Sequence, residues 1–476
     1  MNYNTPLYNA LKTYSKKRKI PFHMPGHKLG KGIADRFKGE IFNIDLTELR
    51  ETDDLHAPEG PIKEAQRLAA KAFGAWHTFF LVNGSTCGIQ TMVAGICNPG
   101  DVLIVDRNCH SSVIHALILC GVSPYYIYPE YIPKLGVAGG MNPQRVEEAL
   151  KRYPQAKGVF ITCPTYYGIC SDMKTIANIV HRYNKVLMVD EAHGAHFCFH
   201  PGLPLGALRS GADMCVQSAH KTLPALTQSA LLHVNSDRID LHRIKKCLKM
   251  FQTSSPSFVL MAYLDAARSI MECNGNELLS DLIRWCQQAR ESINQSKQLY
   301  CLGSELAGSH QIQSVDCTRM VVNVCNTGLS GYQVERELYT FGDIQVEMSD
   351  MNNILCIPSP GNSEEQLMAL VHSLKAIISD IVVENNARVV GKYCDSQYSM
   401  SPAHAFYSES KVVNLRDAVG EVCSDMITCY PPGIPVLCPG EMISGDIAEY
   451  ILCVKNAGGK VTGMADERNI RVIKNL

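Results

Sequence analysis

The sequence predicts an α/β fold built around a largely parallel sheet. From about Thr78 onward, short apolar runs alternate with segments of helical periodicity, which is the pattern of successive βα units. The runs are apolar at consecutive positions, as over residues 186–189, so we expect the strands to be buried on both faces. At 476 residues, the chain is long enough for two or three domains with large cores.

The expected strands follow one another along the first half of the chain. They are Thr78–Val82, Asp101–Asp106, Ser123–Tyr128, Gly158–Thr162, Val186–Asp190, Met214–Gln217 and Ala230–Val234. Helical segments are expected between many of them, over Thr86–Cys97, Ser111–Cys120, Pro143–Tyr153 and Met173–Tyr183. Together they predict a mainly parallel seven-stranded sheet covered by crossover helices.

The chain is expected to divide into four parts. Residues 1–60 form an N-terminal arm interrupted by prolines and glycines, and residues 61–290 form the large domain. A helical stretch from Ser257 to about Ser296 leads to a small α+β domain over residues 291–380. Strand-like runs at Met320–Val324 and Asn353–Ile357 and a helix at Glu364–Ile378 are expected there. Residues 381–476 form a C-terminal subdomain.

The composition is that of a globular protein without a bias toward nucleic acid or membranes. The formal net charge is −1 at pH 7, so we expect neither as a partner. The basic residues near the N-terminus have no apolar run behind them, unlike a signal peptide, and no run approaches the roughly 18 apolar residues of a transmembrane helix. The 20 cysteines include no C-x-x-C pair. Reduced thiols and a cytoplasmic location are therefore expected.

Lys221, in Ser218-Ala219-His220-Lys221, is the most informative residue of the chain. It lies roughly thirty residues after Asp190, which ends an apolar strand and opens Asp190-Glu191-Ala192-His193-Gly194. A lysine of lowered pKa can form a Schiff base with pyridoxal phosphate (PLP), and a buried carboxylate can keep the pyridine nitrogen of that cofactor protonated. The structural alternatives are a surface lysine and a helix-capping aspartate. Together, the two motifs predict a PLP site.

Two further segments follow predicted strands. Asn83-Gly84-Ser85-Thr86 opens a predicted helix, where amides and hydroxyls can bind a phosphate, or where a hydroxyl can simply cap the helix. His110 could stack on a cofactor ring or could cap the helix that begins at Ser111. The spacing of His193, His196 and His200 could suit a metal, but the segment lacks a helical pattern, and we expect no metal site.

These motifs resemble those of the Orn/Lys/Arg decarboxylases, in the short Gram-positive-type branch of arginine decarboxylase-like proteins. The matching stretches keep the family's order along nearly the whole chain. They are residues 21–28, 45–49, 53–56, 58–60, 82–86, 164–168, 190–194, 218–222 and 431–435. The resemblance implies the aspartate-aminotransferase-like fold (PLP fold type I), with a large domain and a smaller α+β C-terminal domain. It also implies a homodimer, or a higher even oligomer, with the active site at the interface.

The resemblance also implies roles for individual residues. Lys221 would bind PLP covalently, Asp190 would pair with the pyridine nitrogen, His110 would stack on the ring, and His193 would lie near the phenolic oxygen. Ser85, Thr86, Ser218 and His220 would bind the phosphate, and Thr165 would lie near the substrate. We therefore expect decarboxylation of a basic amino acid, with Lys221 or His220 returning the proton to Cα. Thr222-Leu223-Pro224-Ala225 departs from the family's more usual glycine- or alanine-rich stretch.

A basic substrate side chain needs an acidic or aromatic partner at the far end of the pocket. Glu347, Asp350 and Glu441 are the candidates, although each could be an ordinary loop carboxylate. Among members of the family, the resemblance favours arginine as substrate, giving agmatine for polyamine biosynthesis, ahead of lysine and ornithine, which would give cadaverine and putrescine.

Three other functions remain as alternatives. An α-oxoamine synthase would share the Asp-x-x-His motif of Asp190 and His193, but a histidine directly before the Schiff-base lysine is unusual there. An aminotransferase would need an arginine for the substrate α-carboxylate, which no motif identifies. A catalytically silent regulatory paralogue would not be expected to keep every cofactor residue.

Overall fold

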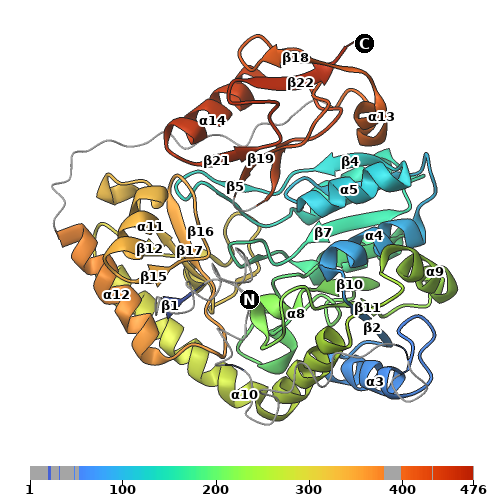
Figure 1. Ribbon diagram of the computed structural model, residues 1–476, viewed down its shortest axis with the longest axis horizontal. Coiled ribbons are helices and arrows are strands. Elements are labelled where there is room, and N and C mark those ends of the chain that lie inside the picture. The colour runs from blue at the N-terminus through green and yellow to red at the C-terminus, as the bar shows by residue number, and fades with distance from the viewer. Residues whose placement is uncertain are drawn as a thin grey trace, which may run out of the picture.

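The computed structural model describes residues 20–22, 32, 48, 53–379, 398–430 and 433–474. Its centre is a seven-stranded sheet in the order β2-β11-β10-β9-β7-β3-β4 (Figure 1). The strands are β2 (His77–Leu81), β3 (Val102–Asp106), β4 (Ser123–Ile127), β7 (Gly158–Thr162), β9 (Val186–Asp190), β10 (Met214–Gln217) and β11 (Ala230–Val234). Only β11 runs antiparallel to its neighbours in this sheet. The predicted mainly parallel sheet is thus confirmed.

Helices cover both faces of the sheet, because successive side chains of its strands point to opposite sides. Leu103 and Val105 pack with α4 (Gly84–Ile96), α5 (Ser111–Cys120) and α9 (Leu241–Phe251). Ile104 packs on the other face with α3 (Pro61–Phe73), α6 (Pro143–Arg152), α7 (Met173–Arg182) and α10 (Phe258–Asn294). The consecutive apolar runs of the sequence reflect this burial on both faces.

The small second sheet lies beside the long helix α10. It has four antiparallel strands, β12 (Tyr300–Cys301), β14 (Met320–Asn323), β17 (Asn353–Cys356) and β16 (Met348–Ser349), in that order. Helices α11 (Gly331–Thr340) and α12 (Glu364–Ser379) pack with it and share the main core with the large sheet. Strand β1 (Ile20–Pro21) pairs with β15 (Ile344–Gln345) here, whereas most of the predicted N-terminal arm lies outside the described residues.

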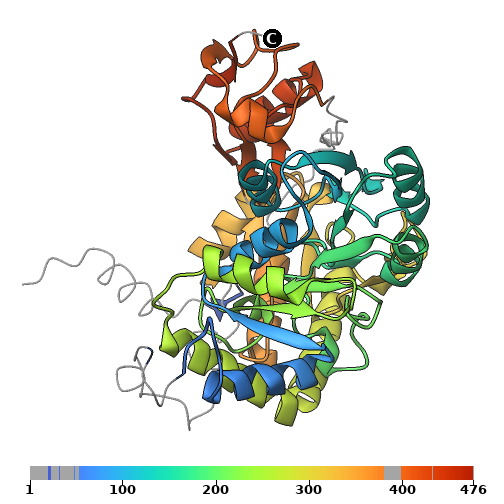
Figure 2. The same ribbon diagram turned by 90° about the vertical axis from the view of Figure 1, so that its right-hand side faces the viewer.

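The C-terminal residues form a third unit with its own core (Figure 2). Its elements are α13 (Pro402–Tyr407), β18 (Ser410–Asn414), β19 (Ile427–Tyr430), β20 (Pro435–Leu437), α14 (Gly445–Asn456), β21 (Lys460–Thr462) and β22 (Asn469–Ile473). Strand β19 pairs with β20 and β21, and β18 pairs with β22. Helix α13 packs on α5 of the large domain, so the unit sits next to the loop that carries His110.

Short connecting elements complete the described chain. They are the strands β5 (Tyr131–Ile132), β6 (Val137–Ala138), β8 (Ile169–Cys170) and β13 (Ser314–Val315), the short helix α8 (Ala219–Thr222), and the 3₁₀ helices Phe197–Phe199, Ser304–Leu306 and Cys325–Thr327. Every described cysteine is a free thiol. Within the described ranges, no helix is both long and apolar enough to cross a membrane.

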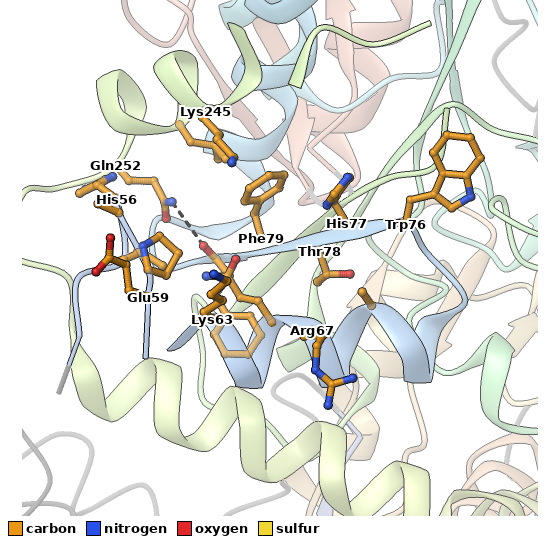
Figure 3. A pocket seen from close by; sticks show the side chains of 17 residues that line it. His56, Glu59, Lys63, Arg67, Trp76, His77, Thr78, Phe79, Lys245 and Gln252 are labelled. Carbon is orange, nitrogen blue, oxygen red and sulfur yellow. Dashed lines mark hydrogen bonds between the residues drawn. The ribbon is translucent and has the colours of Figure 1, made fainter. Parts of the chain in front are cut away.

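Gln252 closes part of the open edge of the large sheet. Its carboxamide donates to the carbonyl of Phe80 at 3.3 Å (Figure 3). It also accepts from the backbone N–H of Val82 at 2.8 Å, as a neighbouring strand would. Val82 is 2% exposed. The Gln252 side chain therefore satisfies backbone groups of β2 just before the turn at Gly84.

Replacing Gln252 by leucine should lower the free energy of unfolding by about 1–3 kcal/mol, because the buried N–H of Val82 loses its acceptor. Urea denaturation measures this loss. The matched control is Gln287→Leu on the exposed face of α10, where a change within about 0.5 kcal/mol is expected. Equal shifts in the two variants would contradict the role of Gln252.

Candidate active site

The candidate residues gather at one edge of the large sheet because six of its seven strands run in the same direction. Strands β9 and β10 are parallel neighbours, with Asp190 opposite Val216, so the segment after Gln217 begins beside Asp190. Strands β3 and β7 end at the same edge, before His110 and Thr165. Ligands bind at this carboxyl edge in open α/β folds.

Lys221 lies in helix α8, directly after β10. Its Nζ is 3.0 Å from Nε2 of His193. Burial lowers the pKa of the Lys221 amine from its usual value, while the charges of Asp190 and Glu347 oppose this shift. A lysine held this way is closer to the neutral, nucleophilic form than a surface lysine is.

Asp190 ends β9 with a side chain that is 3% exposed. One of its oxygens accepts from the backbone N–H of Ala192 at 3.0 Å. Burial raises the pKa of the Asp190 carboxyl, and the nearby charge of Lys221 acts in the opposite direction. The site therefore contains a buried carboxylate that would be stabilised by an additional positive charge.

Three buried hydroxyl groups lie close to Lys221 in the sequence, two of them in the turn that carries it and one just before β11. The hydroxyls of Ser218, Thr222 and Ser229 have no hydrogen-bond partner within the part of the chain that the structure describes. His220 contributes an imidazole whose Nδ1 is 3.0 Å from the carbonyl oxygen of Ser229. Buried hydroxyls normally find a partner, so such a group of them is typical of a polar ligand site.

Ser85 and Thr86 lie in the first turn of α4, after Gly84, whose φ of +71° requires a residue tolerant of the left-handed region. His110 is the N-cap of α5, and its Nδ1 accepts from the backbone N–H of Ser112. The capping alternative for His110 is thus confirmed. Burial, and next the charge of Lys221, lower the pKa of His110 to about 4, which makes it a neutral ring beside the lysine.

The three substrate candidates have different surroundings. Glu347 accepts a hydrogen bond from the hydroxyl of Tyr166 at 2.6 Å and is electrostatically coupled to Lys221. Asp350 accepts from Tyr167 and from the backbone of Asn353, which fixes a turn of the small sheet.

The structure corrects the expectation for Glu441, which has a structural role. Its two oxygens form a bidentate ion pair with Arg107 at 2.8 and 2.9 Å, and one of them also accepts from the N–H of Cys438. Both partners of the ion pair are nearly fully buried. The Glu441 carboxylate is therefore already satisfied.

The three histidines after Asp190 have separate partners. His193 approaches Lys221, His196 Nε2 lies 3.2 Å from Asp316, and His200 Nε2 lies 3.0 Å from the hydroxyl of Ser280. The described residues contain no group of three or more histidine, cysteine, aspartate or glutamate side chains that could hold a metal ion. The spacing of the histidines thus has a structural explanation.

Sequence reasoning missed two residues of this site. The ring of Tyr166 lies 4.5 Å from that of His193, and Arg319 donates to Nδ1 of His193 from the segment before β14. Tyr166 belongs to the stretch 164–168, which matches the family, but nothing in the sequence indicates that His193 is its partner. A single arginine before an apolar strand gives no local signal, because its contact with His193 spans 126 positions of the sequence.

A separate hollow of about 570 Å³ runs along the edge strand β2, between α3 and α9 (Figure 3). Side chains that line it include His56, Lys63, Arg67, Trp76 and Lys245. None of the candidate cofactor residues lines it. The hollow is therefore distinct from the cluster around Lys221.

Comparison with known proteins agrees with this geometry. Residues 5–366 match the family model for the Orn/Lys/Arg decarboxylase major domain, and residues 387–469 match that for the C-terminal domain. The chain is 39% identical to the arginine decarboxylase of Bacillus subtilis, over 99% of this chain and 98% of the relative. It is 41% identical to that of Halalkalibacterium halodurans, with the same two coverages.

Solved structures show the same fold. The lysine decarboxylase of Francisella novicida superimposes with a TM-score of 0.79 at 22% identity, covering 98% of this chain and 81% of that one. A Sphingomonas wittichii serine palmitoyltransferase covers 67% of this chain with a TM-score of 0.54 at 13% identity, a likeness of fold alone. Because the two family models match most of the chain and the relatives match nearly all of it, the chain belongs to the Orn/Lys/Arg decarboxylase family of enzymes.

Proposed function

We propose that this protein decarboxylates L-arginine to agmatine and carbon dioxide with PLP as its cofactor. The observation that carries the proposal is the half-buried Lys221, whose amine lies 3.0 Å from His193 and within electrostatic reach of the buried carboxylate of Asp190. The choice of arginine is supported by the curated relatives, which are named arginine decarboxylases at about 40% identity over nearly the whole chain.

The residues of the site fit PLP on chemical grounds. The lowered pKa of Lys221 suits attachment of an aldehyde, and the raised pKa of buried Asp190 calls for a cationic partner such as a protonated pyridine nitrogen. The unpartnered hydroxyl of Ser218 and the N-terminus of α4 are suited to a phosphate. These groups come from separate segments that meet at one edge of the sheet.

The proposed roles follow from these positions. Lys221 would attach the cofactor, Asp190 would pair with its ring nitrogen, His110 would lie against the ring, and His193 would lie near the phenolic oxygen. The phosphate ligands would be Ser85, Thr86, Ser218 and His220. Thr165, whose hydroxyl accepts from the N–H of Ile169, would lie at the substrate end. When bound, PLP supplies an electron sink for the electron pair left on Cα as carbon dioxide departs.

The side chains of the protein then have three tasks. The pocket orients the Cα–carboxylate bond so that it breaks in preference to Cα–H. Asp190 holds the positive charge that draws electrons away from Cα. Lys221 or His220 returns one proton to Cα, and the reaction takes up one proton overall.

Glu347 is the proposed partner of the substrate guanidinium because its charge acts on Lys221, whereas Asp350 fixes a turn of the small sheet and Glu441 pairs with Arg107. Replacing Glu347 by glutamine should raise KM for arginine roughly 10- to 100-fold, with a smaller effect on kcat, since a charge-assisted hydrogen bond contributes about 1.5–3 kcal/mol. Steady-state kinetics measure both parameters. A lower kcat at unchanged KM would contradict this assignment.

We also propose a homodimer or a higher even oligomer, with the active site at the interface, and a cytoplasmic role in polyamine synthesis. This part rests on the family resemblance and on the free cysteine thiols of the described chain. Sedimentation of the PLP-loaded protein tests the assembly. A monomer at micromolar concentration would overturn it.

The test of function measures amine formation and carbon dioxide release by PLP-loaded protein with arginine, lysine and ornithine in parallel. Lys221→Ala is the control for the site. Agmatine from arginine alone supports the proposal, whereas cadaverine or putrescine instead would keep the reaction and change the substrate. If no substrate yields carbon dioxide despite bound cofactor, the protein is an acyl transferase of the oxoamine-synthase type or a silent regulatory paralogue.

A further inference from the structure

Arg319 is a buried cation beside His193, and only one of its three guanidinium nitrogens has a hydrogen-bond partner in the described chain. Its side chain is 1% exposed, and Nε and Nη1 have no hydrogen-bond partner in the described chain. Its carboxylate neighbour, Asp316, lies 3.6 Å away and is shared with His196 and Thr318. Burying a charge with so few partners is costly, so a function for it is expected.

The surrounding chain makes room for this arginine. Gly168 adopts a φ of +82°, and a Cβ at this position would lie 2.5 Å from Cγ of Arg319. Asp316 is held by the hydroxyl of Thr318 at 2.6 Å. His196 and Arg319 lower the pKa of the Asp316 carboxyl to about 2, so Asp316 remains an anion against which the guanidinium is placed.

The contact of Arg319 with His193 determines where the imidazole carries its proton. Nη2 of Arg319 lies 3.1 Å from Nδ1 of His193 and 3.0 Å from its carbonyl oxygen. A guanidinium only donates hydrogen bonds, so Nδ1 must accept and cannot carry a hydrogen. A neutral imidazole then has its proton on Nε2, which faces Lys221 Nζ at 3.0 Å. The Lys221 nitrogen must in turn accept, which a protonated ammonium cannot do.

We propose that Arg319 is a positioning residue that fixes the Nε2–H tautomer of His193 and thereby keeps the Lys221 amine unprotonated. This adds to the proposed function, in which Lys221 attaches the cofactor. Only the unprotonated amine has the lone pair needed to attack an aldehyde.

Burial and nearby charges also act on the protonation of His193 and Lys221. Burial, with the cation of Arg319, holds the pKa of His193 well below its usual value, so the ring is neutral. Lys221 faces the carboxylates of Asp190 and Glu347, which favour its charged form, and the cation of Arg319, which opposes it. His110 also lies within electrostatic reach of Lys221. The contact between His193 Nε2 and Lys221 Nζ adds a directional constraint, because an Nε2–H can donate only to an unprotonated amine.

The first measurement is the pH dependence of reductive methylation at Lys221 in the full-length chain stripped of PLP, followed by peptide mass spectrometry. Arg319→Met removes the donor and the charge and should raise the apparent pKa of Lys221 by about one unit or more. Arg319→Lys keeps a donor-only cation and should retain most of the lowered value. The control is Arg268→Met, which removes a buried arginine that pairs with Asp265 and Glu272 in α10 and should change nothing at Lys221.

The second measurement reads the tautomer directly and needs no folded methionine variant. The nitrogen NMR spectrum of the histidine-labelled protein, with the His193 signals identified by their loss in His193→Gln, should show an unprotonated Nδ1. A protonated Nδ1 in the wild-type chain would overturn the proposal, as would an unchanged Lys221 pKa in a folded Arg319→Met protein. Neither readout involves bound PLP or turnover, so failure here and failure of the proposed function are distinguishable.

Discussion

Asp190→Asn should lower kcat by roughly two to three orders of magnitude while leaving the PLP-free protein at least as stable as the wild type. The loss of activity is expected because an uncharged amide would no longer hold the positive charge that draws electrons away from Cα. Asparagine can still accept the backbone N–H of Ala192, so the local turn should persist.

The sign of the stability change follows from the pKa of Asp190. Burial raises this pKa in the folded chain above its unfolded value, so the folded state binds a proton more tightly than the unfolded state does. The PLP-free protein therefore loses stability as the pH rises from the pKa of an unfolded aspartate to the raised pKa of Asp190, and above the raised pKa the loss is complete. An amide at this position removes the loss, so the free energy of unfolding should fall less with rising pH above the ordinary pKa of an aspartate.

Asp213 provides the matched control, because it is also a buried carboxylate but has its partners in place. It accepts from the N–H of Leu187 at 2.8 Å and from His181 at 2.9 Å, at the opposite end of the sheet. Asp213→Asn should lower the free energy of unfolding and leave kcat nearly unchanged. Thermal unfolding without PLP and kinetics with PLP give the two readouts. If both variants lose stability equally, Asp190 is an ordinary structural carboxylate.

The parts of the fold that the sequence predicts well are those determined by local pattern. The strands Gly158–Thr162 and Met214–Gln217 have the predicted bounds, because apolar runs end at turn-forming residues on both sides. Helix α5 also begins and ends where predicted, between the cap at His110 and Gly121. The strand ends in turn predict which side chains reach the site.

The parts that the sequence does not predict depend on contacts between distant segments. The sequence makes Glu441 a candidate pocket carboxylate, because Pro439-Gly440-Glu441 has the composition of an ordinary polar loop. Its partner Arg107 is 334 positions away and gives no periodic signal. The contact between Arg319 and His193 is hidden for the same reason. Local pattern thus predicts the positions of candidate side chains, whereas their partners require the folded chain.

The ion pair of Arg107 and Glu441 should prove to be a major attachment of the C-terminal unit to the large domain. Two guanidinium nitrogens bind the carboxylate, and the third donates to the carbonyl of Pro435 at 2.7 Å. Arg107→Met should lower the free energy of unfolding of the protein by about 3–5 kcal/mol, because it leaves the buried Glu441 charge without its partner. Arg107 lies three positions before His110, so the loss should also weaken PLP binding.

The double variant Arg107→Met/Glu441→Gln separates the cost of an orphaned charge from the value of the contact. Glutamine can still accept from the N–H of Cys438, which now bonds to Glu441 at 2.8 Å, but it carries no charge. The double variant should therefore recover much of the lost stability, since an uncharged buried pair avoids the desolvation cost. Hydrogen exchange over residues 106–112 and 433–443, with urea denaturation, measures the change at the contact and in the whole chain. A double variant as unstable as Arg107→Met would mean that directional hydrogen bonds, rather than charge pairing, attach the C-terminal unit beside His110.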